Sequence, residues 1–160
     1  MKLSLSTYGW LSCPWQEYEI IARDMHYEGI EIHDIREARL SGPGAPFEQA
    51  FISRTKRRMA AQRIRISCVD ALKNPADKEQ FDACVKEAEE LISFAAEVHC
   101  EYIRLRARQT GLEASAEDEN VRSVIRALIA KAEKAGVTVL IETAGIYADT
   151  ARLAALLDSF

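Results

Sequence analysis

The chain has 160 residues, 48% hydrophobic and 29% charged, with a formal net charge of −4. This size and composition are typical of one globular domain with a sizeable core, and the acidic balance argues against nonspecific binding to nucleic acid. No apolar run approaches the roughly 20 residues of a membrane span, and polar residues follow Met1 too soon for a signal peptide. We therefore expect a cytoplasmic protein.

Short apolar segments alternate with longer helical ones along the chain, at the spacing of βα units. Five strands are expected, at residues 2–6, 29–33, 64–69, 101–105 and 137–141. Five helices are expected between and after them, at residues 15–25, 47–62, 76–98, 117–135 and 150–158. Gly136 is a typical helix-stop residue, Gly29 suits the turn into the second strand, and residues 37–46 are rich enough in Gly and Pro for a loop.

Five parallel βα units are compatible with two α/β architectures. The chain could form five of the eight units of a TIM (β/α)8 barrel, or a flavodoxin-like doubly wound sheet that is complete at this length. No G-x-G-x-x-G or Walker sequence follows the first strand, so a phosphate-cradling loop is not expected there.

Cysteines and clustered basic residues carry no clear motif. Because the cysteines are widely separated and form no zinc-binding spacing, buried reduced thiols are expected at Cys13, Cys68, Cys84 and Cys100. A basic cluster is explained best as the solvated face of an amphipathic helix, with a phosphate-binding patch as the alternative. It comprises Arg54, Lys56, Arg57, Arg58, Arg63 and Arg65.

The strand segments, taken in order, resemble one family. Residues 136–143, with Glu142 at the end of the fifth strand, and residues 27–32, 64–69 and 102–105 resemble the sugar phosphate isomerase/epimerase family. This is the xylose isomerase-like TIM barrel group (AP endonuclease family 2). The resemblance covers residues 1–160 as a single domain, apparently truncated after the fifth of eight βα units.

The resemblance implies a catalytic and metal-binding role for Glu142, with a divalent metal that is manganese or magnesium, or zinc as a third option. Such a carboxylate can take a proton from a carbon next to a carbonyl that the metal polarises. The family's other metal ligands lie on later strands, so we expect this fragment to be inactive. The family's ketose 3-epimerases carry a second glutamate where this chain has residues 143–149, which weakens assignment to that subtype.

Four further residues are candidates for binding a small sugar or sugar phosphate. His33 ends the second strand, and Arg104 and Arg106 alternate along the fourth. Trp10, two residues after Tyr8, follows the first strand. The sequence is equally compatible with a surface or hydrogen-bonding role for His33 and with simple packing of Trp10. The arginines could instead pair with Glu142, and a solvated Arg106 is at least as compatible with the sequence.

Two other functions are compatible with the fold. The chain could be a non-catalytic ligand-binding or oligomerising module, with a homodimer covering its open sheet edges. A DNA-repair role like that of endonuclease IV is disfavoured by the acidic balance and by the three histidines, too few at the strand ends for a trinuclear zinc site.

Overall fold

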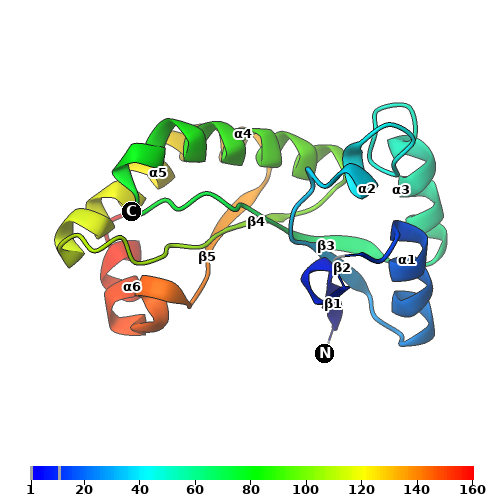
Figure 1. Ribbon diagram of the computed structural model, residues 1–160, viewed down its shortest axis with the longest axis horizontal. Coiled ribbons are helices and arrows are strands. Elements are labelled where there is room, and N and C mark those ends of the chain that lie inside the picture. The colour runs from blue at the N-terminus through cyan, green and yellow to red at the C-terminus, as the bar shows by residue number, and fades with distance from the viewer. Residues whose placement is uncertain (1, 11) are drawn as a thin grey trace. The chain divides into compact units, whose positions relative to one another are not determined.

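A computed structural model describes residues 2–10 and 12–160 of the chain. Parallel strands occur at all five predicted positions (Figure 1). They are β1 (Ser4–Ser6), β2 (Gly29–Ile32), β3 (Arg65–Asp70), β4 (Tyr102–Leu105) and β5 (Thr138–Ile141). The alternation of short apolar segments with helical ones therefore predicted the order of elements correctly.

Helices follow each strand. They are α1 (Trp15–Asp24), α2 (Ala38–Ser41), α3 (Ile52–Ala61), α4 (Phe81–Glu97), α5 (Ala114–Ala135) and α6 (Thr150–Leu157). Single 3-10 turns are present at η1 (Thr7–Trp10), η2 (Lys78–Gln80) and η3 (Gly145–Ala148). The sequence did not predict α2, which is a single turn that ends where Gly42 adopts an extended backbone. The predicted helix 47–62 begins only at Ile52.

The chain divides into two compact units. The N-terminal unit comprises the residues up to Asp70 together with Ala95–Glu101, and the C-terminal unit comprises Ala71–Phe94 and Tyr102–Phe160. In the N-terminal unit β2 lies between β1 and β3 and is parallel to both. In the C-terminal unit β4 and β5 are parallel neighbours. A flavodoxin-like sheet would place β1 between β2 and β3, so that alternative is wrong.

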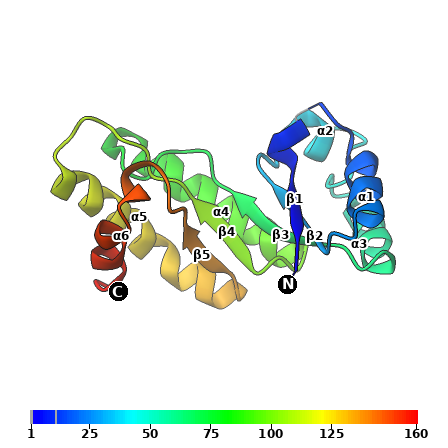
Figure 2. The ribbon, with the colours of Figure 1, turned by 90° about the horizontal axis from the view of Figure 1, so that it is seen from below.

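The core of the N-terminal unit is formed where α1 and α3, which lie side by side in both views, cover the strands (Figures 1 and 2). Ile30 on β2 and Trp15 and Tyr18 on α1 are almost completely buried. Glu19 on α1 is also buried, and it accepts a hydrogen bond of 2.9 Å from Nη2 of Arg58 on α3. A buried carboxylate needs such a partner, because an unpaired charge in the core is strongly destabilising.

The C-terminal unit has its own apolar cluster. Val121 on α5, Tyr147 in η3 and Leu156 on α6 are almost completely buried there, and Ile141 of β5 packs against them. This cluster holds the segments that follow β4 and β5 against α5 and α6. The loops at the ends of these strands are therefore anchored by burial of apolar area.

Gly29 has a different role from the predicted turn. It is the first residue of β2, and a Cβ there would lie 2.4 Å from Oγ of Ser4 and 2.9 Å from Cβ of Ser67. Only glycine allows the three strands to approach at this point. The left-handed turn before β2 is instead made by His26, with a φ of 57°.

Four helices end in the same backbone motif. After each helix the amide of one residue bonds to the carbonyl five positions back, as Tyr27 does to Ala22 and Val137 does to Ala132. This Schellman motif requires a left-handed residue, which the sequence correctly predicted at Gly136. The other three helices use His26, Arg63 and His99, with φ between 57° and 58°. Each of these side chains costs about 1 kcal/mol relative to glycine.

Candidate functional site

His33 and Asp70 form a polar pair at the C-terminal ends of β2 and β3. Nδ1 of His33 lies 3.2 Å from Oδ2 of Asp70, whose side chain is 9% exposed. The backbone N–H of His33 donates to Oγ1 of Thr7 (2.9 Å), which fixes the start of the loop after β2. In the neutral tautomer with its proton on Nδ1, the imidazole donates to the carboxylate, which only accepts, and Nε2 keeps a lone pair.

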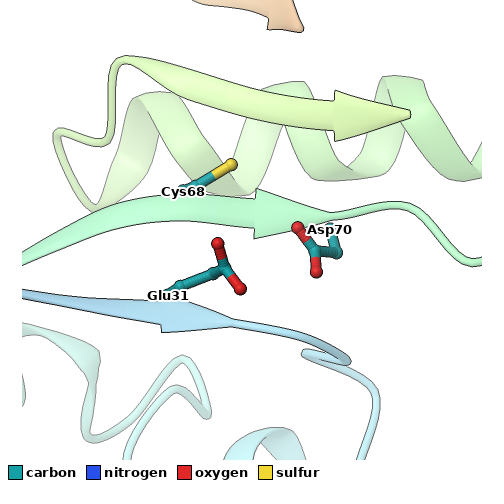
Figure 3. Close-up of side chains that lie close together, drawn as sticks. All are labelled: Glu31, Cys68 and Asp70. Atoms are coloured by element: carbon teal, nitrogen blue, oxygen red, sulfur yellow. The ribbon is translucent and has the colours of Figure 1, made fainter. Parts of the chain in front are cut away.

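Asp70 also belongs to a group of three residues on β2 and β3 that carry potential metal-ligand atoms (Figure 3). The strand register shifts after Ile30 and places Glu31 opposite Cys68, so that Glu31 reaches toward Asp70. One donor atom from each of Glu31, Cys68 and Asp70 lies within 4.8 Å of the others. Cys68 and Asp70 are buried and Glu31 is half-buried. The C-terminal ends of β2 and β3 therefore carry two carboxylates and a thiol close together.

The segment after β1 borders the same strand ends. The ring of Tyr8 contacts the imidazole of His33 edge to face, with 4.6 Å between the ring centroids. Trp10, predicted to bind substrate, lies in η1 with 53% of its surface exposed. Its backbone carbonyl accepts a hydrogen bond from the Tyr18 hydroxyl, so the backbone of Trp10 is fixed while its ring faces outward. The exposed ring of Trp10 and its fixed backbone both allow contact with a ligand.

In the C-terminal unit Glu142 directly follows β5, as predicted. Its backbone N–H donates to the carbonyl of Leu105 (2.9 Å), which extends the β4–β5 pairing by one residue. Its Oε2 lies 3.4 Å from Nε of Arg106, just beyond β4. The two side chains are 28% and 51% exposed, respectively, so the pair is open to a ligand. Arg104 lies within β4 and is half-buried.

Gly145 and Asn74 hold the loops beside Glu142. Gly145 has a φ of 60°, and a Cβ there would lie 2.0 Å from the carbonyl oxygen of Ala107. The amide of the next residue, Ile146, donates to that same carbonyl (3.2 Å). Asn74 accepts from the amide of Arg108 (2.9 Å) and donates to its carbonyl (3.0 Å). Glycine is therefore required at position 145 for the loop after β5 to contact the loop after β4.

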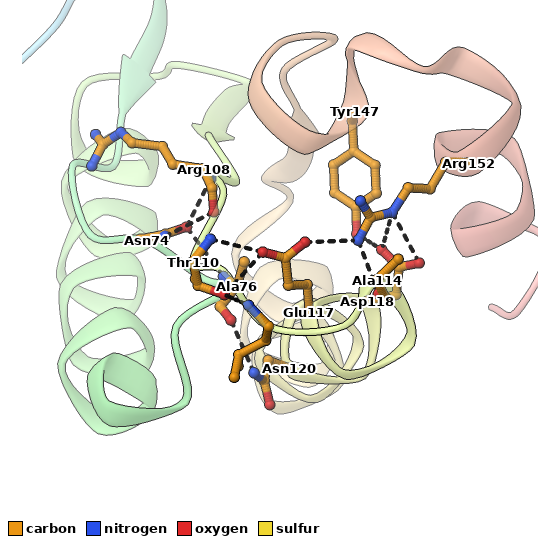
Figure 4. Close-up of polar contacts among 11 residues, drawn as sticks. Asn74, Ala76, Arg108, Thr110, Ala114, Glu117, Asp118, Asn120, Tyr147 and Arg152 are labelled. Carbon is orange, nitrogen blue, oxygen red and sulfur yellow. Dashed lines mark hydrogen bonds and ion pairs between the residues drawn. The ribbon is translucent and has the colours of Figure 1, made fainter.

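A buried ion network anchors the loop after β4 (Figure 4). Oε1 of Glu117 accepts from the amide and the hydroxyl of Thr110 (2.7 and 2.9 Å), and Oε2 lies 3.1 Å from Nη2 of Arg152. Nε of Arg152 donates to Asp118 (2.9 Å), which also accepts from the hydroxyl of Tyr147 (3.0 Å). The network joins α5, η3, α6 and the loop after β4.

Burial and the neighbouring groups together set the pKa values of two members of this network. Burial by itself raises the pKa of Glu117, but the hydrogen bonds from Thr110 and Arg152 outweigh it, so the pKa lies below its ordinary value. Burial raises the pKa of Tyr147 well above its usual range, and the neighbouring Asp118 carboxylate adds to this effect. At neutral pH Glu117 is therefore ionised and Tyr147 keeps its proton.

The structure places the sequence-predicted residues in two groups. The N-terminal unit contains His33 and Trp10, and the C-terminal unit contains Glu142, Arg104 and Arg106. Sequence reasoning missed Asp70, although it ends an apolar strand in the same way as Glu142. It also missed the network around Glu117, since no local pattern links that residue to Arg152.

The cysteines are reduced, as predicted. Cys68, Cys84 and Cys100 are buried, whereas Cys13 is half-exposed, which corrects the expectation for that residue. Burial raises the pKa of Cys84 to about 12, which keeps it protonated and unreactive. Among residues 2–10 and 12–160, no helix is long and apolar enough to cross a membrane.

Glu142 alone does not complete a metal site. It is a hard oxygen donor of the kind that magnesium and manganese prefer, but these ions need several ligands. Within the described part of the chain, the one group of three close donors is Glu31, Cys68 and Asp70, and Glu142 is not a member. The donors beside Glu142 in this chain therefore do not by themselves fit a bound metal.

Comparison with known proteins identifies the family. The sequence profile of the xylose isomerase-like TIM barrel family matches residues 20–160. The chain therefore belongs to this family, and its five parallel βα units are consistent with a partial barrel. No curated protein sequence matches the chain.

Three solved structures show the same fold. The probable 3-DHS dehydratase AsbF from Bacillus anthracis is 18% identical (TM-score 0.78), and 99% of this chain covers 60% of that one. The IolI protein, described with a bound zinc atom, is 14% identical (TM-score 0.73), and the match covers 88% of this chain and 51% of that one. A sugar phosphate isomerase/epimerase from Parabacteroides distasonis is 17% identical (TM-score 0.63; 96% and 60% covered). This chain thus spans 51–60% of the length of these proteins.

Replacing Glu117 by glutamine tests the network that anchors the loop after β4. We expect Glu117→Gln to lower the free energy of unfolding at pH 7 by roughly 1–3 kcal/mol, because it removes the charge that Thr110 and Arg152 stabilise. The folded-state pKa of Glu117 lies below the unfolded value, so this stabilisation is complete above the unfolded pKa, ordinarily near 4.5. It is lost as the pH falls through the folded pKa.

Urea unfolding of both proteins between pH 3 and pH 7 measures this difference. The gap between wild type and variant should be constant near neutral pH and should narrow below about pH 4.5. A gap that stays unchanged to the lowest pH would contradict an ionic role for Glu117.

Proposed function

We propose that this chain supplies the substrate-binding and proton-transfer residues of a sugar isomerase/epimerase-type barrel, acting on a small sugar or sugar phosphate. The observation that carries the proposal is the position of Glu142, a carboxylate at the C-terminal end of β5 that is ion-paired with Arg106 and partly open to solvent. In parallel βα folds, chemistry is built at the C-terminal ends of the strands. The neighbouring structures, described as a dehydratase and an isomerase/epimerase, support this reading.

In the proposed reaction the Glu142 carboxylate takes a proton from a carbon next to a carbonyl and returns it to the substrate. With further ligands from outside residues 1–160, Glu142 would hold a divalent metal such as the zinc described in the IolI protein, and that metal would polarise the carbonyl. Arg106 fixes the orientation of the carboxylate before substrate binds. Because a partly exposed ion pair contributes only about 0–1 kcal/mol, a substrate phosphate can compete with Glu142 for the guanidinium.

In the N-terminal unit the proposed substrate contact is Nε2 of His33. Asp70 holds Nδ1, so the imidazole is orientated with an acceptor nitrogen directed away from the carboxylate. That nitrogen can accept a hydrogen bond from a sugar hydroxyl. The aromatic rings of Tyr8 and Trp10 offer apolar surface of the kind that sugar rings stack on.

Because Glu142 belongs to no group of close metal-binding donors among the described residues, we infer that residues 1–160 do not catalyse the reaction by themselves. We expect no exchange of ketose phosphate C–H protons with solvent deuterium, above a blank with Mn²⁺ alone, when the purified chain is followed by proton NMR in D2O. Glu142→Gln serves as the matched control, because it keeps the shape of the side chain and removes the base. Exchange that exceeds the blank and disappears in this variant would show that the chain is active alone.

We also propose that a second copy of the chain covers β5. Within the described residues β5 pairs only with β4. Leu140 is 37% exposed, and Val139 and Ile141 are half-buried. A strand with a free edge and an exposed apolar side chain is suited to pairing with an identical strand.

Sedimentation velocity over a range of concentrations tests this association. We expect a concentration-dependent dimer, and Leu140→Lys should weaken it at least about tenfold, since a charge would be buried at the interface. Thr138→Lys places a charge on the same face at the start of the strand. If the contact is centred on Leu140, this variant should weaken the dimer less than Leu140→Lys does. A wild-type chain that sediments as a monomer at all concentrations would contradict the proposal.

A further inference from the structure

A cavity of about 320 Å³ lies in the N-terminal unit at the start of β3. It is formed by α3, the turn into β3 and the end of α4. Because β3 has six residues, this cavity is roughly 16 Å from Asp70 at the other end of the strand. It is therefore a separate site from the His33–Asp70 pair. The cavity is lined by Phe47, Lys56, Met59, Ala60, Arg63, Ile64, Arg65, Ile66, Val98 and His99.

The walls of the cavity are apolar and buried. Phe47, Met59 and Ile64 are between 4% and 6% exposed, and Ile66 and Val98 are also buried. A volume of this size, with buried apolar walls, is at the lower end of the range for small-molecule pockets. The walls favour a ligand with an apolar body, such as a phenyl ring or a short alkyl chain.

The rim of the cavity is basic. Arg63, Arg65 and His99 are exposed, and Lys56 is half-buried with its Nζ donating to the carbonyl of Glu97. No Asp or Glu lines the cavity, and neither arginine forms an ion pair with a carboxylate in the part of the chain that is described. Two guanidinium groups beside an apolar cavity, with no internal anion, favour an anionic ligand.

Two residues at the rim have a left-handed backbone conformation. Arg63 and His99 occupy left-handed positions where glycine has lower energy, and both residues line the cavity. His26 has the same conformation and does not line the cavity. The left-handed conformation therefore does not mark a binding site. It does allow a rim residue to be replaced by glycine, which removes the side chain without straining the fold.

We propose that this cavity binds a small organic carboxylate with an apolar body, of the fatty-acid type. The apolar body lies against Met59, Ile64 and Val98, and the carboxylate pairs with the planar guanidinium groups of Arg63 and Arg65. The geometry of a carboxylate matches that of an arginine side chain, which can donate two parallel hydrogen bonds to it. The basic cluster noted in the sequence is thus divided between the Arg58–Glu19 pair, the exposed face of α3 and this rim.

An NMR titration of the 160-residue chain with octanoate tests the proposal. We expect saturable shifts of the methyl signals of Met59, Ile64, Ile66 and Val98. Acetate, which has the charge without the apolar body, and 1-octanol, which has the apolar body without the charge, should each bind at least about tenfold more weakly. Octanol binding as tightly as octanoate, or no saturable shift with octanoate, would overturn the proposal.

Arg63→Gly and His26→Gly form a matched pair of variants. Both relieve a left-handed side chain, so we expect neither to lower the thermal midpoint of unfolding. Arg63→Gly should weaken octanoate binding roughly fivefold because it removes one ion-pair partner, whereas His26→Gly should leave the affinity unchanged. Equal affinity of the two folded variants would overturn the assignment of Arg63 to the site.

Discussion

Backbone pairing of consecutive parallel strands decides where the functional side chains of this chain lie. In the N-terminal unit the register shift after Ile30 places Glu31 opposite Cys68 and brings Asp70 within reach of His33. In the C-terminal unit the amide of Glu142 bonds to the carbonyl of Leu105, so the carboxylate stands directly beyond the paired strands. Because side chains alternate along a strand, a slip of one residue would move these groups to the face that packs against the helices.

Buried carboxylates stabilise the supports around these strand ends. Glu19 joins α1 to α3 through Arg58, and Glu117 joins the loop after β4 to α6 through Arg152. A buried ion pair gives little net stability compared with a well-packed pair of apolar side chains. The loss of one charged partner, however, is strongly destabilising. These pairs therefore favour a unique arrangement of helices and loops.

The order of elements and the family could be predicted from the sequence, because both depend on local patterns. Apolar segments and helical periodicity located all five strands, and Glu142 was found at the end of one of them. Contacts that depend on register could not be predicted: no pattern within β3 alone shows that Asp70 meets His33. Of the four left-handed residues at helix ends, only Gly136 was predicted. The other three, His26, Arg63 and His99, are not glycines and so gave no sign of this conformation. Gly29 was wrongly read as a turn because its role depends on Ser4 and Ser67 from other strands.

We propose that the ends of β4 and β5 bind a sugar phosphate through Arg106 and Glu142. Backbone amide NMR during titration with a ketose phosphate tests this claim most directly, with the unphosphorylated ketose as the comparison. We expect saturable shifts at residues 105–107 and 141–143, with tighter binding of the phosphorylated ketose. Shifts that avoid both segments, or equal binding of the two ketoses with no change at Arg106, would contradict it.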